Sequence, residues 1–284
     1  MKQSKIQNPK SNITQALNGK TIGFIGAGTM GQALLKGLVE RGVDRRQLIA
    51  ADANPQTRRT VTQRFRMSTT DDNGRAAQRA DVIVLAIKPQ QFPEMLDGLR
   101  SHVHPRALVI SIAAGITLRW LQKRLPGIPL VRVMPNLPAT VGCGFSALAR
   151  GTKATRRHRA MARALFEAVG TVVELPERHF DAITAVSGSG PAYLVFVVQA
   201  WRDVARSLGL PEAIADAAIH STVQGSLRLW QQSGESPDVL MQRVASKGGT
   251  TEAALRVLVR RRVAQSLMKA VRAAAQRSRQ LAWS

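Results

Sequence analysis

Short apolar runs alternate with amphipathic segments through the first half of the chain, and this alternation limits the possible folds more than any other feature. Each run has the length of a buried strand, and segments with helical spacing, such as 30–42, separate the runs. A strand-helix-strand rhythm predicts a mainly parallel sheet covered by helices. The runs are 21–27, 47–52, 81–88, 107–115 and 130–135, with two further candidates at 144–150 and 170–176.

Beyond Pro176 the apolar runs give way to helical patterns. We therefore expect an α/β protein with an N-terminal Rossmann dinucleotide-binding domain over residues 21–176 and an all-helical C-terminal domain over residues 177–284. The three long late helices carry more apolar positions than one small helical layer can bury, which predicts a dimerisation domain. These helices are expected at 191–208, 211–232 and 262–281.

The ends of the chain and its apolar content argue against export and membrane insertion. Residues 1–20 are polar and lack the apolar core of a signal peptide, so we expect a mobile tail there. The longest apolar run, 192–201, is shorter than the roughly 20 residues of a spanning helix, which predicts no transmembrane segment. The single cysteine, Cys143, cannot form an internal disulfide, which favours a reducing, cytoplasmic setting.

The formal net charge of +23 is the most unusual property of the composition, because so basic a protein attracts nucleic acids. Most of the arginines are interspersed along expected helices, and no basic motif is interleaved with aromatic residues. We therefore favour solvated helix faces over a nucleic-acid surface, and keep a nucleic-acid-binding protein on a retired dehydrogenase fold as an alternative. The five scattered histidines show no metal-ligand spacing, so no metal site is predicted.

A glycine-rich turn follows the first predicted strand and opens the first predicted helix. Its residues are Gly26, Ala27, Gly28, Thr29, Met30 and Gly31, in the pattern GxGxxG. Between a buried strand and an amphipathic helix, this pattern is typical of dinucleotide binding, although a purely structural turn would have the same letters. Gly26 would permit the tight turn, Gly28 the approach of the pyrophosphate, and Gly31 the packing of the helix.

The end of the second predicted strand carries conflicting signals about the cofactor. Asp52 is placed to accept a hydrogen bond from a ribose 2′-hydroxyl, which would favour NAD, or to cap the turn of 52–55. Arg58 and Arg59 follow, and either side chain would pair with the 2′-phosphate of NADP. The residues alone leave NADPH and NADH both open.

Three further strand ends are expected to line the path of the nicotinamide, because the carboxyl ends of parallel strands form the ligand crevice of an open sheet. Each of these segments also has a plain structural interpretation, as a loop charge, a close-packed turn or a core residue. The candidate cofactor-binding residues are Lys88 and Pro89, then Ala113, Ala114 and Gly115, then Met134, Pro135 and Asn136.

A second glycine-rich segment, SKGGTTEAAL at 246–255, lies in the helical half. Glycines before a helix leave backbone N–H groups free at its positive end, a geometry that binds anions. We expect the amides of Gly248, Gly249 and Thr250 to bind a carboxylate, with Ser246 and Lys247 beside them. The alternative is a capping glycine that ends one helix and a capping threonine that starts the next.

Taken in order, six motifs resemble the pyrroline-5-carboxylate reductase family over residues 21–280. They are FIGAGTM, AIKPQ, VISIAAG, RVMPNLPA, AVSGSGPAY at 185–193, and SPDVLMQRVASKGGTTEAAL at 236–255. The resemblance implies a Rossmann domain and a helical domain that interlocks with a partner in a homodimer, commonly assembled into a ring. It also implies hydride transfer from a reduced nicotinamide cofactor, usually NADPH, to the C=N carbon of Δ1-pyrroline-5-carboxylate, giving proline.

The resemblance also assigns roles in the substrate site. It places the hydroxyl of Thr251 at the ring nitrogen, and Ser187 and Ser189 where a helix approaches the substrate. The family usually has Asn where this chain has Thr29, and often has Pro where Lys247 stands. A reductase of another cyclic imine remains the second enzymatic hypothesis. A 3-hydroxyacid dehydrogenase is disfavoured, because the segment 191–208 lacks the catalytic lysine expected there.

Overall fold

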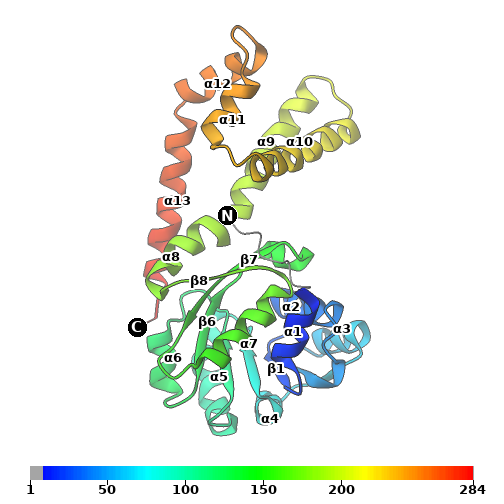
Figure 1. The fold of residues 1–284 in the computed structure, drawn as a ribbon, viewed down its shortest axis with the longest axis vertical. Helices are drawn as coiled ribbons and strands as arrows, with labels where there is room; N and C mark the ends of the chain where they lie inside the picture. Colours follow the sequence, from blue (N-terminus) through cyan, green and yellow to red (C-terminus); the bar gives the residue numbers. More distant parts are fainter. Residues whose placement is uncertain (1–8, 284) are drawn as a thin grey trace. The chain divides into compact units, whose positions relative to one another are not determined.

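The computed structural model describes residues 9–283 and has a central sheet of eight strands in the order β3-β2-β1-β4-β5-β6-β7-β8 (Figure 1). The strands are β1 Ile22–Ile25, β2 Leu48–Ala51, β3 Ser68–Thr70, β4 Val82–Leu85, β5 Leu108–Ser111, β6 Leu130–Met134, β7 Gly144–Arg150 and β8 Gly170–Glu174. Strands β1 to β6 are parallel, β7 is antiparallel to β6, and β8 is parallel to β7. The order reverses between β1 and β4, and such a reversal is where open α/β sheets bind ligands.

Helices cover both faces of this sheet, and each face has its own apolar core. Alternate residues of a strand point to opposite faces, so Phe24 of β1 packs in one core and its neighbour Ile25 in the other. Both side chains are fully buried, which explains why the sequence shows continuous apolar runs here. The helices are α2 Thr29–Glu40, α3 Pro55–Phe65, α4 Asn73–Arg79, α5 Phe92–Leu99, α6 Leu118–Arg124, α7 Arg156–Glu167 and α8 Phe180–Ile183.

Two elements of this part differ from the sequence-based expectation. The segment expected to be a mobile tail contains helix α1, Pro9–Leu17, whose Ile13 and Leu17 are each 1% exposed in the core. These two apolar side chains lie four residues apart, so they share one helix face and anchor it against α7. The third strand, β3, was not expected, because its three residues are polar and half-exposed to exposed.

The chain divides into two compact units at positions that differ from the expected boundary. The sheet unit comprises Met1–Ser189 and Ala274–Ser284, and the helical unit comprises Gly190–Ala273. The chain therefore leaves the sheet unit after Ser189 and re-enters it within the last helix. Residues 177–189, expected in the second domain, and the last turns of the final helix belong to the sheet unit.

The helical unit consists of helices joined by short turns. They are α9 Gly190–Ser207, α10 Glu212–Ser233, α11 Pro237–Val244, α12 Thr250–Arg260 and α13 Val263–Gln280, of which residues 274–280 lie in the sheet unit. The turn between α12 and α13 has no glycine, and Arg262 adopts the left-handed conformation there with φ +53°. Only two side chains of the helical unit count as buried hydrophobics, Ala205 and Ala215.

Within residues 9–283, one helical stretch has the length and composition of a membrane-spanning helix, by these two criteria alone, whereas the sequence-based prediction of no transmembrane segment considered only the apolar run at 192–201. It runs over Glu177–Ser207 and reaches a mean hydropathy of 1.3, with 6% of its most apolar window buried. The stretch is longer than the apolar run at 192–201 because the short helical turns around α8 continue into α9. In the described part of the chain, most of this apolar window is exposed.

Candidate functional site

The glycine-rich turn between β1 and α2 is held so that its backbone faces outward. Gly26 has φ +93°, and a Cβ added there would lie 2.6 Å from the carbonyl oxygen of Ala86. A Cβ on Gly31 would lie 2.7 Å from the carbonyl oxygen of Gly26. Both positions therefore require glycine, one for the turn and one for the packing of α2 against it.

Gly28 differs from these two glycines because a Cβ added there would meet no atom within 4 Å. It is the N-cap of α2, and its bare backbone is exposed. Within residues 9–283, the amides of Thr29 and Met30 have no hydrogen-bond acceptor, because the first amides of a helix have no partner within it. A free helix start beside a bare glycine fits a pyrophosphate, and an added side chain would fill that space.

Asp52 connects the glycine-rich turn to the end of β2. Its Oδ2 accepts from the Ala27 amide at 2.8 Å, and its Oδ1 accepts from the Asn54 amide at 2.9 Å. Both carboxylate oxygens therefore already have a backbone donor. These contacts are those of the turn-capping interpretation of Asp52. Each oxygen can still accept one more hydrogen bond, for example from a ribose hydroxyl.

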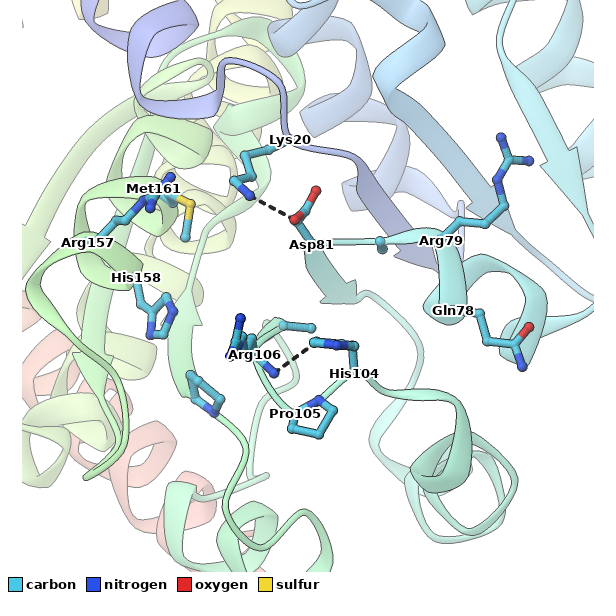
Figure 2. Close-up of a pocket in the computed structure, with 13 residues that line it drawn as sticks. Lys20, Gln78, Arg79, Asp81, His104, Pro105, Arg106, Arg157, His158 and Met161 are labelled. Atoms are coloured by element: carbon cyan, nitrogen blue, oxygen red, sulfur yellow. Dashed lines mark hydrogen bonds and ion pairs between the residues drawn. The ribbon is translucent and has the colours of Figure 1, made fainter.

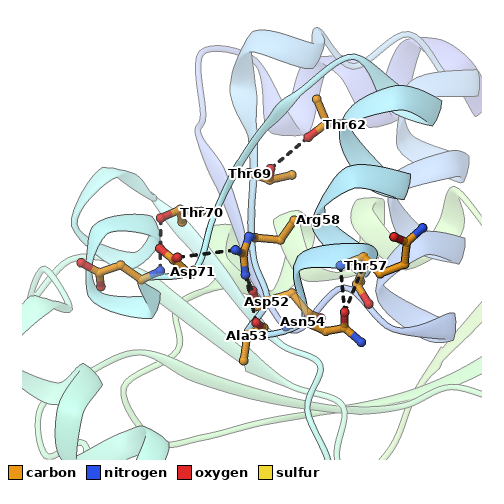
Figure 3. Close-up of polar contacts among 11 residues, drawn as sticks. Asp52, Ala53, Asn54, Thr57, Arg58, Thr62, Thr69, Thr70 and Asp71 are labelled. Carbon is orange, nitrogen blue, oxygen red and sulfur yellow. Dashed lines mark hydrogen bonds and ion pairs between the residues drawn. The ribbon is translucent and has the colours of Figure 1, made fainter.

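Arg58 and Arg59 are adjacent in α3 but differ in how they are held, and Figure 3 shows the contacts of Arg58. Arg58 donates from Nη1 to the carbonyl oxygens of Asp52 at 2.8 Å and Ala53 at 3.0 Å, and its Nη2 lies 3.5 Å from Asp71 Oδ2. These contacts fix its guanidinium at the carboxyl end of β2. Arg59 is exposed and has no partner in the part of the chain that the structure describes.

The ends of β4 and β5 present different surfaces. Lys88 follows β4 as the N-cap of a short turn that begins at Pro89, and its side chain is exposed. Ala113 is buried and Ala114 is exposed after β5. Gly115 was expected to face the cofactor, but with φ +78° it lies under the C-terminal segment, where an added Cβ would be 2.5 Å from the Leu281 carbonyl oxygen. This contact gives Gly115 a structural role, and its contact with a cofactor stays a prediction.

Asn136, after Met134 and Pro135 at the end of β6, is the centre of a three-way connection. Its Oδ1 accepts from the Phe145 amide at 2.8 Å, and its Nδ2 donates to Ser187 Oγ at 3.0 Å and to the Ser187 carbonyl at 3.3 Å. Ser187 belongs to a single π-helical turn, Thr184–Gly188, which ends with a bond from the Ser189 amide to the Thr184 carbonyl. Turns of this kind recur at functional sites.

The loop of the helical unit corrects the expected set of anion donors. The Gly249 amide donates to the Ser246 carbonyl at 3.0 Å, and the Gly248 amide donates to the Glu252 carboxylate. Of the three expected amides, only that of Thr250 has no acceptor within residues 9–283. The amide of Thr251 is also free, because Gly249 is the N-cap and contributes no side chain.

Glycine is favoured at Gly248 by the backbone conformation and at Gly249 by the position of the Ser246 side chain. Gly248 has φ +73°, and a Cβ on Gly249 would lie 2.4 Å from Ser246 Oγ. The capping threonine of the structural alternative is therefore absent, since Thr250 is already the first helical residue. The side chains of Lys247, Thr250 and Thr251 have no partner in the described part of the chain, and Lys247 and Thr250 are exposed.

Glu252, the third residue of α12, has a role that the sequence analysis missed. Besides the Gly248 amide, its carboxylate meets Arg256 at 3.5 Å, one helical turn further on. The signal was present in the sequence, because a Glu at the third helical position commonly reaches back to an amide before the helix. No group of three or more potential metal ligands occurs among the described residues.

Comparisons with known proteins match both halves of the chain. The family model "Pyrroline-5-carboxylate reductase dimerisation" matches residues 177–281, and "NADP oxidoreductase coenzyme F420-dependent" matches residues 21–115. A pyrroline-5-carboxylate reductase of Synechocystis sp. is 39% identical over 261 residues, which are 92% of this chain and 97% of that protein.

Solved structures agree over almost the whole chain. The pyrroline-5-carboxylate reductase of Coxiella burnetii has a TM-score of 0.86 and 32% identity, and the match covers 94% of this chain and all of that one. The Plasmodium falciparum enzyme, solved with NADP bound, has a TM-score of 0.85 and 25% identity, with 93% of this chain and 99% of that one covered.

A Rossmann-type unit with a free glycine-rich helix start, followed by a helical dimerisation domain, defines a two-part dinucleotide-binding oxidoreductase. The expected fold class is thereby confirmed. The chain belongs to the pyrroline-5-carboxylate reductase family, as the six motifs predicted.

Proposed function

We propose that this chain reduces the C=N bond of Δ1-pyrroline-5-carboxylate to give L-proline, the last step of proline biosynthesis, with NADPH as the hydride donor. The family relationship supports the reaction. The observation that carries the proposal is the start of α12, where glycine at the N-cap leaves the amides of Thr250 and Thr251 free. An anionic substrate with a carboxylate matches such a helix start.

The sheet unit provides the cofactor site in this proposal. The bare backbone at Gly28 and the free amides of Thr29 and Met30 bind the pyrophosphate, and the end of β2 holds the adenosine ribose. NADPH supplies the hydride and fixes the direction of the reaction. Arg58 favours NADPH over NADH, because its fixed guanidinium stands beside the ribose position and retains unused donors for a 2′-phosphate. NADH remains usable through Asp52.

The helical unit provides the handle on the substrate carboxylate. The amides of Thr250 and Thr251, at the positive end of α12, bind the carboxylate, and exposed Lys247 adds charge beside them. The negative charge of Glu252 repels the substrate carboxylate only weakly, because the Glu252 carboxylate accepts a hydrogen bond from the Gly248 amide and forms an ion pair with Arg256. The Glu252 carboxylate is therefore already paired, while the amides of Thr250 and Thr251 stay available to the substrate.

Thr251 is the proposed hydrogen-bond donor to the ring nitrogen. The iminium form of the substrate is already electron-poor, so one hydroxyl suffices where other enzymes use a His or Cys. Asn136 acts as a positioning residue, because it holds the Ser187 turn against the end of β6. Ser189 follows that turn and lets the backbone approach the substrate.

The test measures the oxidation of NADPH and NADH that depends on pyrroline-5-carboxylate. Replacing Thr251 by valine should lower kcat/KM roughly 10- to 150-fold, because a hydrogen bond to a charged group is worth about 1.5–3 kcal/mol. The matched control is Thr250→Val, which keeps its amide and should stay within about twofold of wild type. Wild-type turnover in Thr251→Val, with cofactor binding unchanged, would place the donor elsewhere.

The main competing enzyme is a reductase of another cyclic imine. Its cofactor site would be the same, so only the substrate distinguishes the two proposals. The six-membered analogue, Δ1-piperideine-6-carboxylate, tests the difference directly. A higher kcat/KM for that imine than for pyrroline-5-carboxylate would favour the competing reaction.

We further propose a homodimer formed through the helical unit. Its apolar side chains are widely exposed in the single chain, with Phe196 at 76%, Val195 at 63% and Val259 at 76%. Single helices of a soluble protein do not leave such faces open, and a second copy would bury them. Light scattering should therefore give at least a dimer, whereas a monodisperse active monomer would contradict the proposal. We also propose that the dimers assemble into a larger ring. The free thiol of Cys143 supports a reducing, cytoplasmic setting.

A further inference from the structure

A cavity of about 730 Å³ lies at the amino ends of the strands, whereas the glycine-rich turn and Asn136 follow the carboxyl ends. Asp81, Ala107 and Pro129 line it, and each of these residues directly precedes a strand, β4, β5 or β6. Figure 2 shows the hollow between α7 on one side and the loop before β5 on the other. The cavity and the candidate cofactor-binding residues therefore lie at opposite ends of the strands of one sheet.

The cavity is strongly basic. Its lining holds four cations, Lys20, Arg79, Arg106 and Arg157, against one carboxylate, that of Asp81. Asp81 accepts from Lys20 Nζ at 2.8 Å and from the Thr21 amide at 2.9 Å. Desolvation opposes these contacts, but together with the charges of Lys20 and Arg157 they lower the pKa of Asp81, so this carboxylate is ionised and already paired.

Two of the arginines are free to bind a ligand. The guanidinium groups of Arg106 and Arg157 are exposed and have no acceptor among residues 9–283. Arg157 is the second residue of α7, where the positive end of the helix dipole adds to its charge. Arg79 is directed away from the hollow in Figure 2 and is not needed for the argument.

Two imidazoles present hydrogen-bond donors to the same hollow. His158 Nδ1 accepts from the Thr155 amide at 3.2 Å, and His104 Nδ1 accepts from the Arg106 amide at 3.2 Å. With Nδ1 as acceptor, the neutral ring must carry its proton on Nε2. Burial and then the charge of Arg157 lower the pKa of His158, which keeps that ring neutral at physiological pH.

We propose that this cavity binds the di- or triphosphate group of a small molecule, at a site separate from the cofactor crevice. The volume is that of a small-molecule site, and without Arg79 the lining still carries two net positive charges. These charges, with two fixed N–H donors, match a polyphosphate better than one carboxylate. The lining contains no Phe, Tyr or Trp, so nothing there stacks on a base, as single-stranded nucleic acid would require. The phosphate group is therefore what the site recognises.

Calorimetric titration of the full-length protein with inorganic tripolyphosphate, in the presence of saturating NADPH, tests the proposal. We expect one site per chain, and a loss of about tenfold or more in affinity for Arg157→Glu and for Arg106→Glu. The matched control is Arg119→Glu, which makes the same charge change at the second residue of α6, after Thr117 as its N-cap. Glutamate is favourable near a helix start, so Arg157→Glu and its control should both fold.

Each outcome decides the matter. Equal losses in the control and cavity variants would mean that net charge alone attracts the anion, and would overturn the site. Binding that disappears when NADPH saturates the protein would place the anion in the cofactor crevice, with the same consequence. Tight binding of a DNA duplex without binding of tripolyphosphate would also overturn it. Equal affinities for ATP and tripolyphosphate would support recognition of the phosphate group, and a preference for ATP would identify a nucleotide as its carrier.

Discussion

The side-chain amide of Asn136 donates hydrogen bonds to both the hydroxyl and the carbonyl oxygen of Ser187, which lies 51 positions later in the sequence. The same side chain accepts a hydrogen bond from the Phe145 amide, so one side-chain amide joins the end of β6 and the start of β7 to the π-helical turn. The strand edge and the segment that precedes α9 are therefore held together before any ligand binds.

Replacing Asn136 by aspartate should separate these connections. The carboxylate still accepts from the Phe145 amide but brings an acceptor against the Ser187 carbonyl, so the protein should lose about 1–3 kcal/mol of unfolding free energy. Urea unfolding measures the loss, and an increased KM for substrate should accompany it. Ser187→Ala removes only the Oγ acceptor and should cost less than about 1 kcal/mol. A larger loss in the alanine variant than in the aspartate variant would contradict this division.

The two arginines of α3 should differ in their effect on cofactor choice. Arg58→Ala together with Arg59→Ala should raise the KM for NADPH and leave the KM for NADH nearly unchanged, because only NADPH carries the 2′-phosphate. We expect most of the effect from Arg58→Ala, since its guanidinium is fixed by the carbonyls of Asp52 and Ala53 and that of Arg59 is not. Equal changes for both cofactors in steady-state assays would remove Arg58 from the phosphate site.

Gly115→Ala should be destabilising for two separable reasons. The φ of +78° disfavours any L-residue by about 1–2 kcal/mol, and the new Cβ would press on the Leu281 carbonyl. In a chain that ends at Gln280 the second cause is gone, so the substitution should cost less there than in the full chain. A double-mutant cycle of unfolding free energies measures the difference. Strictly additive losses would show that Gly115 and the C-terminal segment are not in contact.

Arg262→Gly should stabilise the protein. The left-handed conformation costs an L-residue about 1–2 kcal/mol, and the greater freedom of glycine in the unfolded chain cancels about half of that. A net gain of about 0.5–1 kcal/mol in unfolding free energy is expected. The control, Arg260→Gly, lies in the last turn of α12 and should instead lose up to about 1 kcal/mol. Destabilisation by both substitutions would show that Arg262 makes a contact worth more than its strain.

Much of the sheet could be predicted from sequence because its strands are buried on both faces. Seven strands were expected at their observed places, and the glycine-rich turn could be assigned through its position between β1 and α2. Strand β3 could not, because three polar residues carry no periodicity. The spacing of Ile13 and Leu17 indicates a helix face, but helix α1 is short and its other residues are mostly polar, so the helix was not predicted.

The details of the site depend on contacts that no local pattern reports. The position of Gly115 under Leu281 joins residues more than 160 positions apart, and the occupied amides of Gly248 and Gly249 follow from the shape of one turn. Sequence patterns indicated which segments are candidates for the site. They did not indicate which amides remain free, because that depends on the full hydrogen-bond pattern.

The return of the chain into the sheet unit has a consequence for its synthesis. Trp283 donates from its amide to the Gly115 carbonyl at 2.8 Å, accepts from Thr117 Oγ1 at 2.7 Å, and packs edge-on against Trp120 at 5.2 Å. Residues 274–283 follow the helical unit in the chain, so the sheet unit can be completed only after the whole helical unit has been translated. The order of translation therefore delays closure of the sheet unit until the surfaces for pairing with a second copy already exist.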